Sequence, residues 1–206
     1  MKLSWRELWL LLYCWQRRFP FHVVLEITGL SHVTVRRWQR VFQVHLMEES
    51  PILSGLVEVD ETFVGRRRHG NQRLVIGAWS RTQSKAVLRC IPDREQGTTD
   101  RFLLAHVNTL GTTVFTDGAA GYRGIDTFFG YEHVTCNHSK WVFGPTNMAE
   151  NLWSRLDRHI TRVYHQVRAK WLPLLVRELE ARINDPELFY SPEAFLKNSL
   201  GLVPTC

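Results

Sequence analysis

A buried β-strand is predicted over Val57-Glu58-Val59-Asp60-Glu61-Thr62, where apolar residues are interleaved with carboxylates. The interior of a strand normally excludes unpaired charge, because a buried ion loses its hydration. Acidic side chains at this place therefore indicate that a cation balances them. Glu58 shares a strand face with Asp60, whereas Glu61 points to the other face. We interpret Glu58 as a flanking charge rather than an auxiliary ligand.

Two further carboxylates have a similar setting. Asp117 closes the apolar run Thr113-Val114-Phe115-Thr116, and Glu150 lies early in a helical segment that ends near Val167. Either acid alone has an ordinary explanation, as a turn residue or as a first-turn acid that complements a helix dipole. Together with Asp60 they supply three acids from three separated elements, which is what a two-metal phosphoryl-transfer site requires. We prefer the metal-site interpretation for the set.

The first 48 residues are predicted to be helical, with Ser4 and Glu7 forming a capping-box pattern. Two later helices, from about residue 21 to 28 and from Ser31 onward, are joined by a turn at Gly29, which is the helix-turn-helix pattern. The polar positions of the second of these helices include Thr34, Arg36, Arg37 and Arg40, with no acid before Glu48. Such a surface is typical of a recognition helix that enters a major groove. A solvated basic face on a small helical cap is the alternative.

From about Leu53 the pattern changes to short strands, predicted over residues 55–64, 73–80 and 85–91 as an antiparallel meander. Helices at 98–110 and 121–129 then alternate with strands at 112–116 and 132–136, and this alternation indicates parallel strands with helices packed on the sheet. The predicted fold class is α/β, a ribonuclease H-like mixed five-stranded sheet flanked by helices and preceded by a small all-α helix-turn-helix domain. The expected boundaries are 1–48 for the helix-turn-helix domain, 54–184 for the catalytic domain and 185–206 for a C-terminal tail with a short helix.

The composition favours a polyanionic partner. The 206 residues, 44% of them hydrophobic, can hold one ordinary core and a small accessory domain, and the net charge is +6. Arg66, Arg67 and Arg68 are predicted at a hairpin tip close to the first acid, where they suit phosphate contacts, although a solvated turn has the same composition.

Two features bear on location. The four cysteines form no CxxC pair, which favours a reduced, cytoplasmic protein. The apolar segment from Trp5 to Trp15 is too short for a membrane span and is interrupted by Arg6 and Glu7, so we predict a core helix there.

Four groups of residues carry a more specific signal. They are Val57-Glu58-Val59-Asp60-Glu61-Thr62-Phe63-Val64-Gly65; Phe115-Thr116-Asp117-Gly118 with Gly121-Tyr122; Asn137-His138-Ser139 ahead of Thr146-Asn147-Met148-Ala149-Glu150-Asn151-Leu152-Trp153-Ser154; and Tyr164-His165-Gln166-Val167 with Lys170-Trp171-Leu172-Pro173. In this order they resemble the signatures of DDE-type insertion-sequence transposases, in the branch related to the eukaryotic Merlin elements. The resemblance runs from about residue 21 to 184.

The resemblance implies that three carboxylates hold two Mg²⁺ ions, with Mn²⁺ as a substitute, and the matching positions are Asp60, Asp117 and Glu150. Some relatives have asparagine in place of the third acid. Asn147 lies one helical turn before Glu150, so we expect it to face the site and the DNA.

One position departs from the family pattern. Seven residues after the third acid the family usually has lysine or arginine, and this chain has Asp157. We expect Arg155 and Arg158 to contact DNA phosphates instead.

These observations predict a DNA transposase that binds the terminal inverted repeats of an insertion sequence and catalyses two-metal phosphodiester hydrolysis and strand transfer. The expected partners are double-stranded DNA, as terminal repeat and as target, and further copies of the chain in at least a homodimer, because two element ends must be cut and joined together. We expect a cytoplasmic protein associated with DNA, most naturally in the bacterial nucleoid, and no membrane partner. The alternatives are a metal-dependent DNA nuclease without transfer activity and a catalytically inactive DNA-binding regulator, and Asp157 is the feature that points to the latter.

Overall fold

The computed structural model describes residues 3–46, 50–65, 72–117, 119–135, 147–165 and 167–200. The elements, in chain order, are α1 (Trp5–Gln16), α2 (Phe21–Thr28), α3 (His32–Val44), β1 (Leu56–Val64), β2 (Arg73–Ser80), β3 (Lys85–Ile91), α4 (Gln96–His106), β4 (Thr113–Thr116), the 3-10 turn η2 (Ala120–Tyr122), α5 (Ile125–Phe129), β5 (Glu132–Thr135), α6 (Asn147–Arg158), the π-helical turn η4 (His159–Tyr164), the 3-10 turn η5 (Ala169–Trp171), α7 (Leu172–Asn184), the 3-10 turn η6 (Pro186–Phe189) and α8 (Pro192–Ser199).

The five strands form one mixed sheet in the order β3-β2-β1-β4-β5. β1 pairs antiparallel with β2, and β2 with β3, whereas β4 runs parallel to β1 and β5 parallel to β4. An antiparallel meander followed by two parallel strands, each reached through a helix, is the ribonuclease H-like arrangement. The predicted fold class is confirmed.

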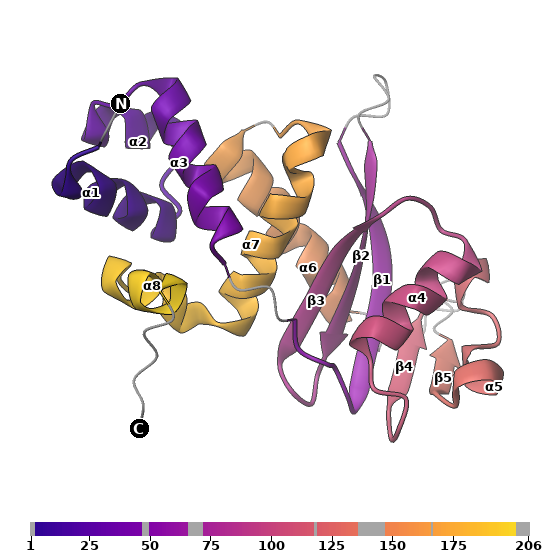
Figure 1. Cartoon of the computed structure of the whole chain (residues 1–206). Coiled ribbons are helices and arrows are strands. Elements are labelled where there is room, and N and C mark those ends of the chain that lie inside the picture. Colours follow the sequence, from indigo (N-terminus) through magenta and orange to yellow (C-terminus); the bar gives the residue numbers. More distant parts are fainter. Residues whose placement is uncertain are drawn as a thin grey trace, which may run out of the picture.

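Helices cover both faces of the sheet (Figure 1). Val57, Val59 and Val114 contribute to a core with α4, η2 and α5 on one face. On the other face, Val75 and Leu88 pack against α6 and α7. Because neighbouring residues of β1 point to opposite faces, Glu58 and Asp60 lie on the α6 side and Glu61 on the α4 side.

The N-terminal helices follow the local signals in the sequence. The Ser4–Glu7 capping box is present, since Glu7 N donates to Ser4 Oγ at 3.2 Å and Ser4 N donates to Glu7 Oε2 at 2.7 Å. Gly29, with a φ of 64°, ends α2, and Ser31 caps α3. Within the described parts of the chain, no helix is long and apolar enough to cross a membrane.

The C-terminal helices complete the core of the N-terminal ones. Phe189 of η6 and Phe195 of α8 lie in the same cluster as Trp15 and Phe42, with ring centroids of both phenylalanines 5.4 Å from the indole of Trp15. The segment predicted as a tail is therefore packed against α1 and α3.

Helix α7 lies between the N-terminal helices and the sheet (Figure 1). Its fully buried Glu178 accepts hydrogen bonds from Gln43 Nε2 at 2.8 Å and from Tyr164 Oη at 2.5 Å. Arg182, one turn later, donates to Glu178 Oε1 at 2.9 Å and to the carbonyl of Trp15 at 2.7 Å. A buried charge needs such partners, so this network joins α1, α3, η4 and α7 through groups that water cannot reach.

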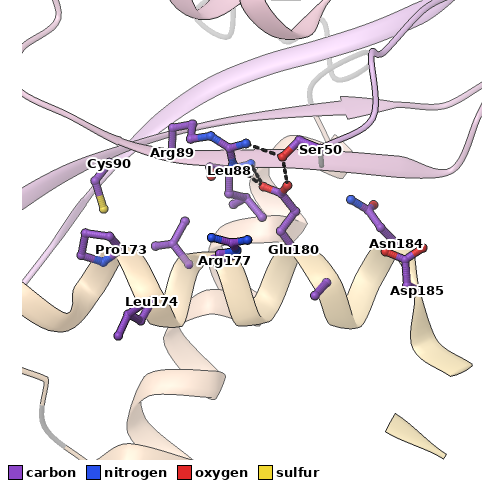
Figure 2. Close-up of a pocket in the computed structure, with 12 residues that line it drawn as sticks. Ser50, Leu88, Arg89, Cys90, Pro173, Leu174, Arg177, Glu180, Asn184 and Asp185 are labelled. Atoms are coloured by element: carbon purple, nitrogen blue, oxygen red, sulfur yellow. Dashed lines mark hydrogen bonds and ion pairs between the residues drawn. The ribbon is translucent and has the colours of Figure 1, made fainter. Parts of the chain in front are cut away.

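A cavity of about 350 Å³ between α7 and β3 contains a second polar attachment, shown in Figure 2. Glu180 accepts from Leu88 N and from Arg89 Nη1, each at 2.7 Å, and from Ser50 Oγ at 2.5 Å. Ser50 follows the N-terminal helices in the chain, and Arg177 donates to the carbonyl of Leu46 at 2.7 Å. Leu46 and Ser50, which lie between α3 and the sheet in the sequence, are thus both bound to side chains of α7.

The observed elements differ from the predicted ones at several boundaries. The helix predicted from residue 98 to 110 is α4, Gln96–His106. The helix predicted over 121–129 is divided into η2 and α5, because Gly124 between them has a φ of 75°. The long helix from about residue 146 keeps α-helical geometry only to Arg158 and continues as η4.

Candidate active site

Asp60 lies half-buried in β1, the central strand of the sheet. Its neighbour on β2 is Gly77, where a Cβ would lie 2.6 Å from the ring of Trp153. The absence of a side chain lets the indole lie across β2, and Trp153 Nε1 donates a 2.7 Å hydrogen bond to Asp60 Oδ2. A neutral donor from α6 therefore fixes the carboxylate of Asp60.

The parallel pairing of β1 and β4 places Asp117 next to Asp60. Glu58 is paired with Phe115, and the same register carried two residues further aligns Asp60 with Asp117. Asp117 comes directly after the last residue of β4, and its charge raises the pKa of Asp60, so the two acids are close enough to interact. Asp117 is exposed, and its Oδ1 accepts a 2.9 Å hydrogen bond from Ala119 N, the turn contact expected of an aspartate at this place.

Glu150 is exposed on the first turn of α6, and Glu58 anchors that turn. The fully buried Glu58 carboxylate accepts from Met148 N at 2.8 Å and from Ala149 N at 2.9 Å, while its other oxygen is paired with Arg81. Glu58 therefore has a structural role beyond that of the flanking charge that the sequence suggested. It caps the helix that carries Glu150, where a negative charge is favoured by unpaired N–H groups and the helix dipole.

The three acids act on one another electrostatically. Burial raises the pKa of Asp60, the hydrogen bond from Trp153 opposes this rise, and the charges of Asp117 and Glu150 add to it. No cation among the described residues forms an ion pair with Asp60. The site therefore concentrates negative charge around a carboxylate that is costly to ionise.

Metal binding fits this site by donor chemistry and charge rather than by spacing. In the described part of the chain, no three His, Cys, Asp or Glu side chains form a set that could hold a metal ion as they stand. Three carboxylates nevertheless offer the hard oxygen ligands that Mg²⁺ and Mn²⁺ prefer. A dication would also supply the positive charge that Asp60 lacks.

Glu61 has a structural role on the opposite face of β1. Its buried carboxylate accepts a hydrogen bond from Tyr122 Oη, and Arg94 Nε lies 3.7 Å from its other oxygen. Burial raises the pKa of Glu61, and burial followed by the charge of Glu61 raises the pKa of Tyr122. This contact ties η2, which follows Asp117, to β1, and so helps to hold that end of the site.

The predicted DNA-binding residues of α3 have different environments. Arg36 donates to the carbonyl of Tyr164 at 3.3 Å, and burial lowers its pKa. The guanidinium of Arg40 lies 4.0 Å from the centroid of the Trp171 ring. Arg37 is exposed, whereas Thr34 forms part of the helix cap with its N–H donating to Ser31 Oγ at 3.3 Å.

The remaining predicted DNA contacts are only partly described. Arg155 lies on α6 with its guanidinium 5.9 Å from the centroid of the Trp79 ring, and Arg158 is exposed and donates to the carbonyl of Ser154 at 3.0 Å. Asp157 is exposed between them. Arg66, Arg67, Arg68, the side chain of Asn147 and the motif Asn137-His138-Ser139 lie outside the described residues.

The strand order, with acids on β1, just after β4 and on α6, is that of a ribonuclease H-like domain of the DDE transposase type. Residues 52–184 match the sequence profile described as the ISXO2-like transposase domain. This match spans more than half of the sequence, and the chain belongs to that family.

Other comparisons give more distant similarity. The integrase catalytic core domain of HTLV-2, determined in complex with magnesium in a trimeric form, is 12% identical over 70% of this chain and 94% of that one, with a TM-score of 0.43. The catalytic core domain of BIV integrase is 12% identical over 64% of this chain and 84% of that one, with a TM-score of 0.44. No curated protein matches the sequence.

Proposed function

We propose that this chain is an active DDE transposase that cuts the ends of an insertion sequence and joins them to target DNA. The observation that supports the proposal is that the charges of Asp117 and Glu150 act on Asp60 within a domain of a transposase family. Asp60, Asp117 and Glu150 are the catalytic residues in this proposal and would hold two Mg²⁺ ions, or Mn²⁺ in their place. Divalent cations bound there would supply Lewis-acid activation of the attacking oxygen and charge stabilisation of the leaving oxygen.

The chain's own residues position the three acids. The hydrogen bond from Trp153 orients the Asp60 carboxylate, and the pairing of β4 with β1 ends just before Asp117 and so brings that residue to the same end of the sheet. Glu58 fixes the first turn of α6, so Glu150 is presented from a helix end that cannot fray freely. Rigid elements of this kind hold catalytic groups more accurately than loops do.

The proposed partner is double-stranded DNA. Helix α3, with Arg37 exposed, is the candidate for recognition of the terminal inverted repeat, and Arg155 and Arg158 for phosphate contact beside the site. Cutting and joining two ends together requires at least a homodimer, and the place of action would be the DNA-containing cytoplasm.

The test is cleavage of labelled DNA that carries the element's own terminal repeat, with Mg²⁺, with Mn²⁺ and with chelator. We expect metal-dependent nicking at the repeat boundary that is lost in Asp60→Asn and kept in Asp126→Asn, a matched change at an exposed aspartate of α5. Strand-transfer products with paired ends would separate a transposase from a nuclease. Tight binding of the repeat without any cut would refute the proposal and favour a DNA-binding regulator, the alternative raised by Asp157.

A further inference from the structure

A basic groove of about 1200 Å³ lies between α3 and the segment that contains η5. Its lining includes six cationic side chains, those of Arg36, Arg37, Arg40, Arg73, Arg168 and Lys170, together with Trp171. None of the described residues that line it is an aspartate or glutamate. An excess of positive over negative side chains along one groove raises the local concentration of anions.

The walls of this basic groove are held by contacts within the chain. Arg36 is fixed by the carbonyl of Tyr164, and Arg40 stacks on Trp171. Arg37, Arg168 and Lys170 are exposed, and none of them forms an ion pair with an acid in the described residues. The groove therefore combines a rigid aromatic wall with exposed charges at its rim, which suits an extended polyanion better than a single small anion.

The basic groove leads toward the carboxylates. Val167 and Ala169 line it and also line a second cleft of about 870 Å³, whose lining also includes Trp153. Trp153 is the residue that donates to Asp60. A ligand lying along both spaces would run from α3 to the catalytic face of the sheet without leaving the surface of one chain.

We propose that the basic groove holds the phosphodiester backbone of the same DNA whose scissile bond is presented at Asp60. The proposal rests on the proposed transposase function and assigns a second DNA-binding surface, made by Arg168, Lys170 and Trp171, outside the predicted recognition helix. Contacts to phosphate carry no sequence information but fix the register of a duplex on the protein. The groove thus sets the distance between the site read by α3 and the bond that is cut.

The experiment is fluorescence anisotropy of the full chain with a labelled duplex carrying the terminal repeat, in chelator, over a series of salt concentrations. The double variant Arg168→Ala/Lys170→Ala removes two rim charges. The control Arg6→Ala/Arg101→Ala removes two exposed charges from α1 and α4, which do not line the groove. Circular dichroism and thermal unfolding confirm that both are folded.

Loss of two phosphate contacts should reduce the slope of log K against log salt by about 1.8 and weaken binding at 0.1 M salt by up to about 60-fold. The control should keep the wild-type slope. An unchanged slope in the groove variant, or an equal reduction in the control, would overturn the groove proposal while leaving the transposase proposal standing. No binding of duplex by the wild type at low salt would instead overturn both.

Discussion

The contact between Gly77 and Trp153 provides a direct test of how Asp60 is positioned. We consider Gly77→Ala, which adds one methyl group to β2 opposite Asp60. The new Cβ would lie 2.6 Å from the indole, whereas ordinary contacts begin at 3.4 Å, so the ring has to retreat by about 0.8 Å. A rigid ring carries Nε1 with it, and its 2.7 Å hydrogen bond to Asp60 is stretched toward the limit of such bonds.

The expected loss of stability follows from three terms. Overpacking costs about 1–3 kcal/mol. The weakened hydrogen bond to a half-exposed carboxylate adds about 1 kcal/mol, and the lower chain entropy of alanine in the unfolded state offsets about 0.5–1 kcal/mol. The net destabilisation is about 1–3 kcal/mol, which for a chain of this size lowers the Tm by about 3–10 °C.

The assay is thermal unfolding in chelator, with Gly97→Ala as the matched control. Gly97 lies in α4, and a Cβ added there would have no neighbouring atom within 4 Å, so alanine should leave the Tm unchanged or raise it. Trp153→Phe removes the ring atoms that the new methyl group meets. In a double-mutant cycle it should therefore suppress most of the Gly77→Ala effect.

The reasoning is refuted if Gly77→Ala unfolds at the same temperature as Gly97→Ala, or if the two changes at Gly77 and Trp153 are additive. A second readout separates positioning from stability. Well below its Tm, Gly77→Ala should still bind the terminal repeat but nick it more slowly, because the Asp60 carboxylate is no longer held.

Three further predictions concern carboxylates with different environments. Glu178→Gln leaves the buried guanidinium of Arg182 without its counter-charge and should lower the free energy of unfolding in urea at pH 7 by about 3–5 kcal/mol. The control Glu193→Gln, in an exposed pair on α8, should lower it by less than about 1 kcal/mol. Burial alone would raise the pKa of Glu178, but its charged and hydrogen-bonding neighbours outweigh burial and hold this pKa below the ordinary 4.5. The stabilisation is therefore present above about pH 4.5, and the difference in unfolding free energy between wild type and Glu178→Gln should shrink as the pH falls. A constant difference down to pH 3 would contradict this prediction. Glu58→Gln should weaken the cap of α6 by about 1 kcal/mol and slow nicking. Ser4→Ala, a comparable loss of a cap on α1, should lower the Tm without slowing nicking. Equal nicking rates in the two variants would show that Glu58 does not position Glu150. Burial first, and then the charges of the neighbouring acids, raise the pKa of Asp60, so its ionised form destabilises the fold above that pKa. Asp60→Asn should therefore raise the Tm at pH 7 in chelator, while millimolar Mg²⁺ should raise the Tm of the wild type alone. A lower Tm for the variant in chelator would show that the charge of Asp60 stabilises the fold without a metal.

Local features of the structure could be predicted because they depend on nearby residues. The capping box at Ser4, the turn at Gly29 and the cap at Ser31 are chosen by side chains within three or four positions. The strands β2 and β3 were predicted with their observed bounds, since each is a short apolar run ended by turn residues. The antiparallel meander and the parallel strands after it could be predicted from the change of pattern along the chain.

Features that depend on distant segments could not be predicted in this way. Nothing near Gly77 in the sequence indicates that its missing side chain accommodates Trp153, 76 positions later, or that this indole binds Asp60. Glu58 could be placed on the correct face of β1, but the backbone that it caps comes 90 positions later. Arg36 shows the same limit, because its place among the polar residues of the predicted helix gives no sign of its hydrogen bond to the carbonyl of Tyr164.

The polar network around α7 has a consequence for the order in which the chain can fold during synthesis. The carbonyl of Trp15 is bound by Arg182, and its indole packs against Phe189 and Phe195, so α1 meets these partners only after more than 160 further residues have been made. Closing such a long loop is slow, and contacts of this kind delay folding. Trp15 and Phe42 can pack on each other early, but the parts of their rings that Phe195 covers stay exposed until α8 has been made, and chaperones or transient contacts would have to protect that surface in the interval.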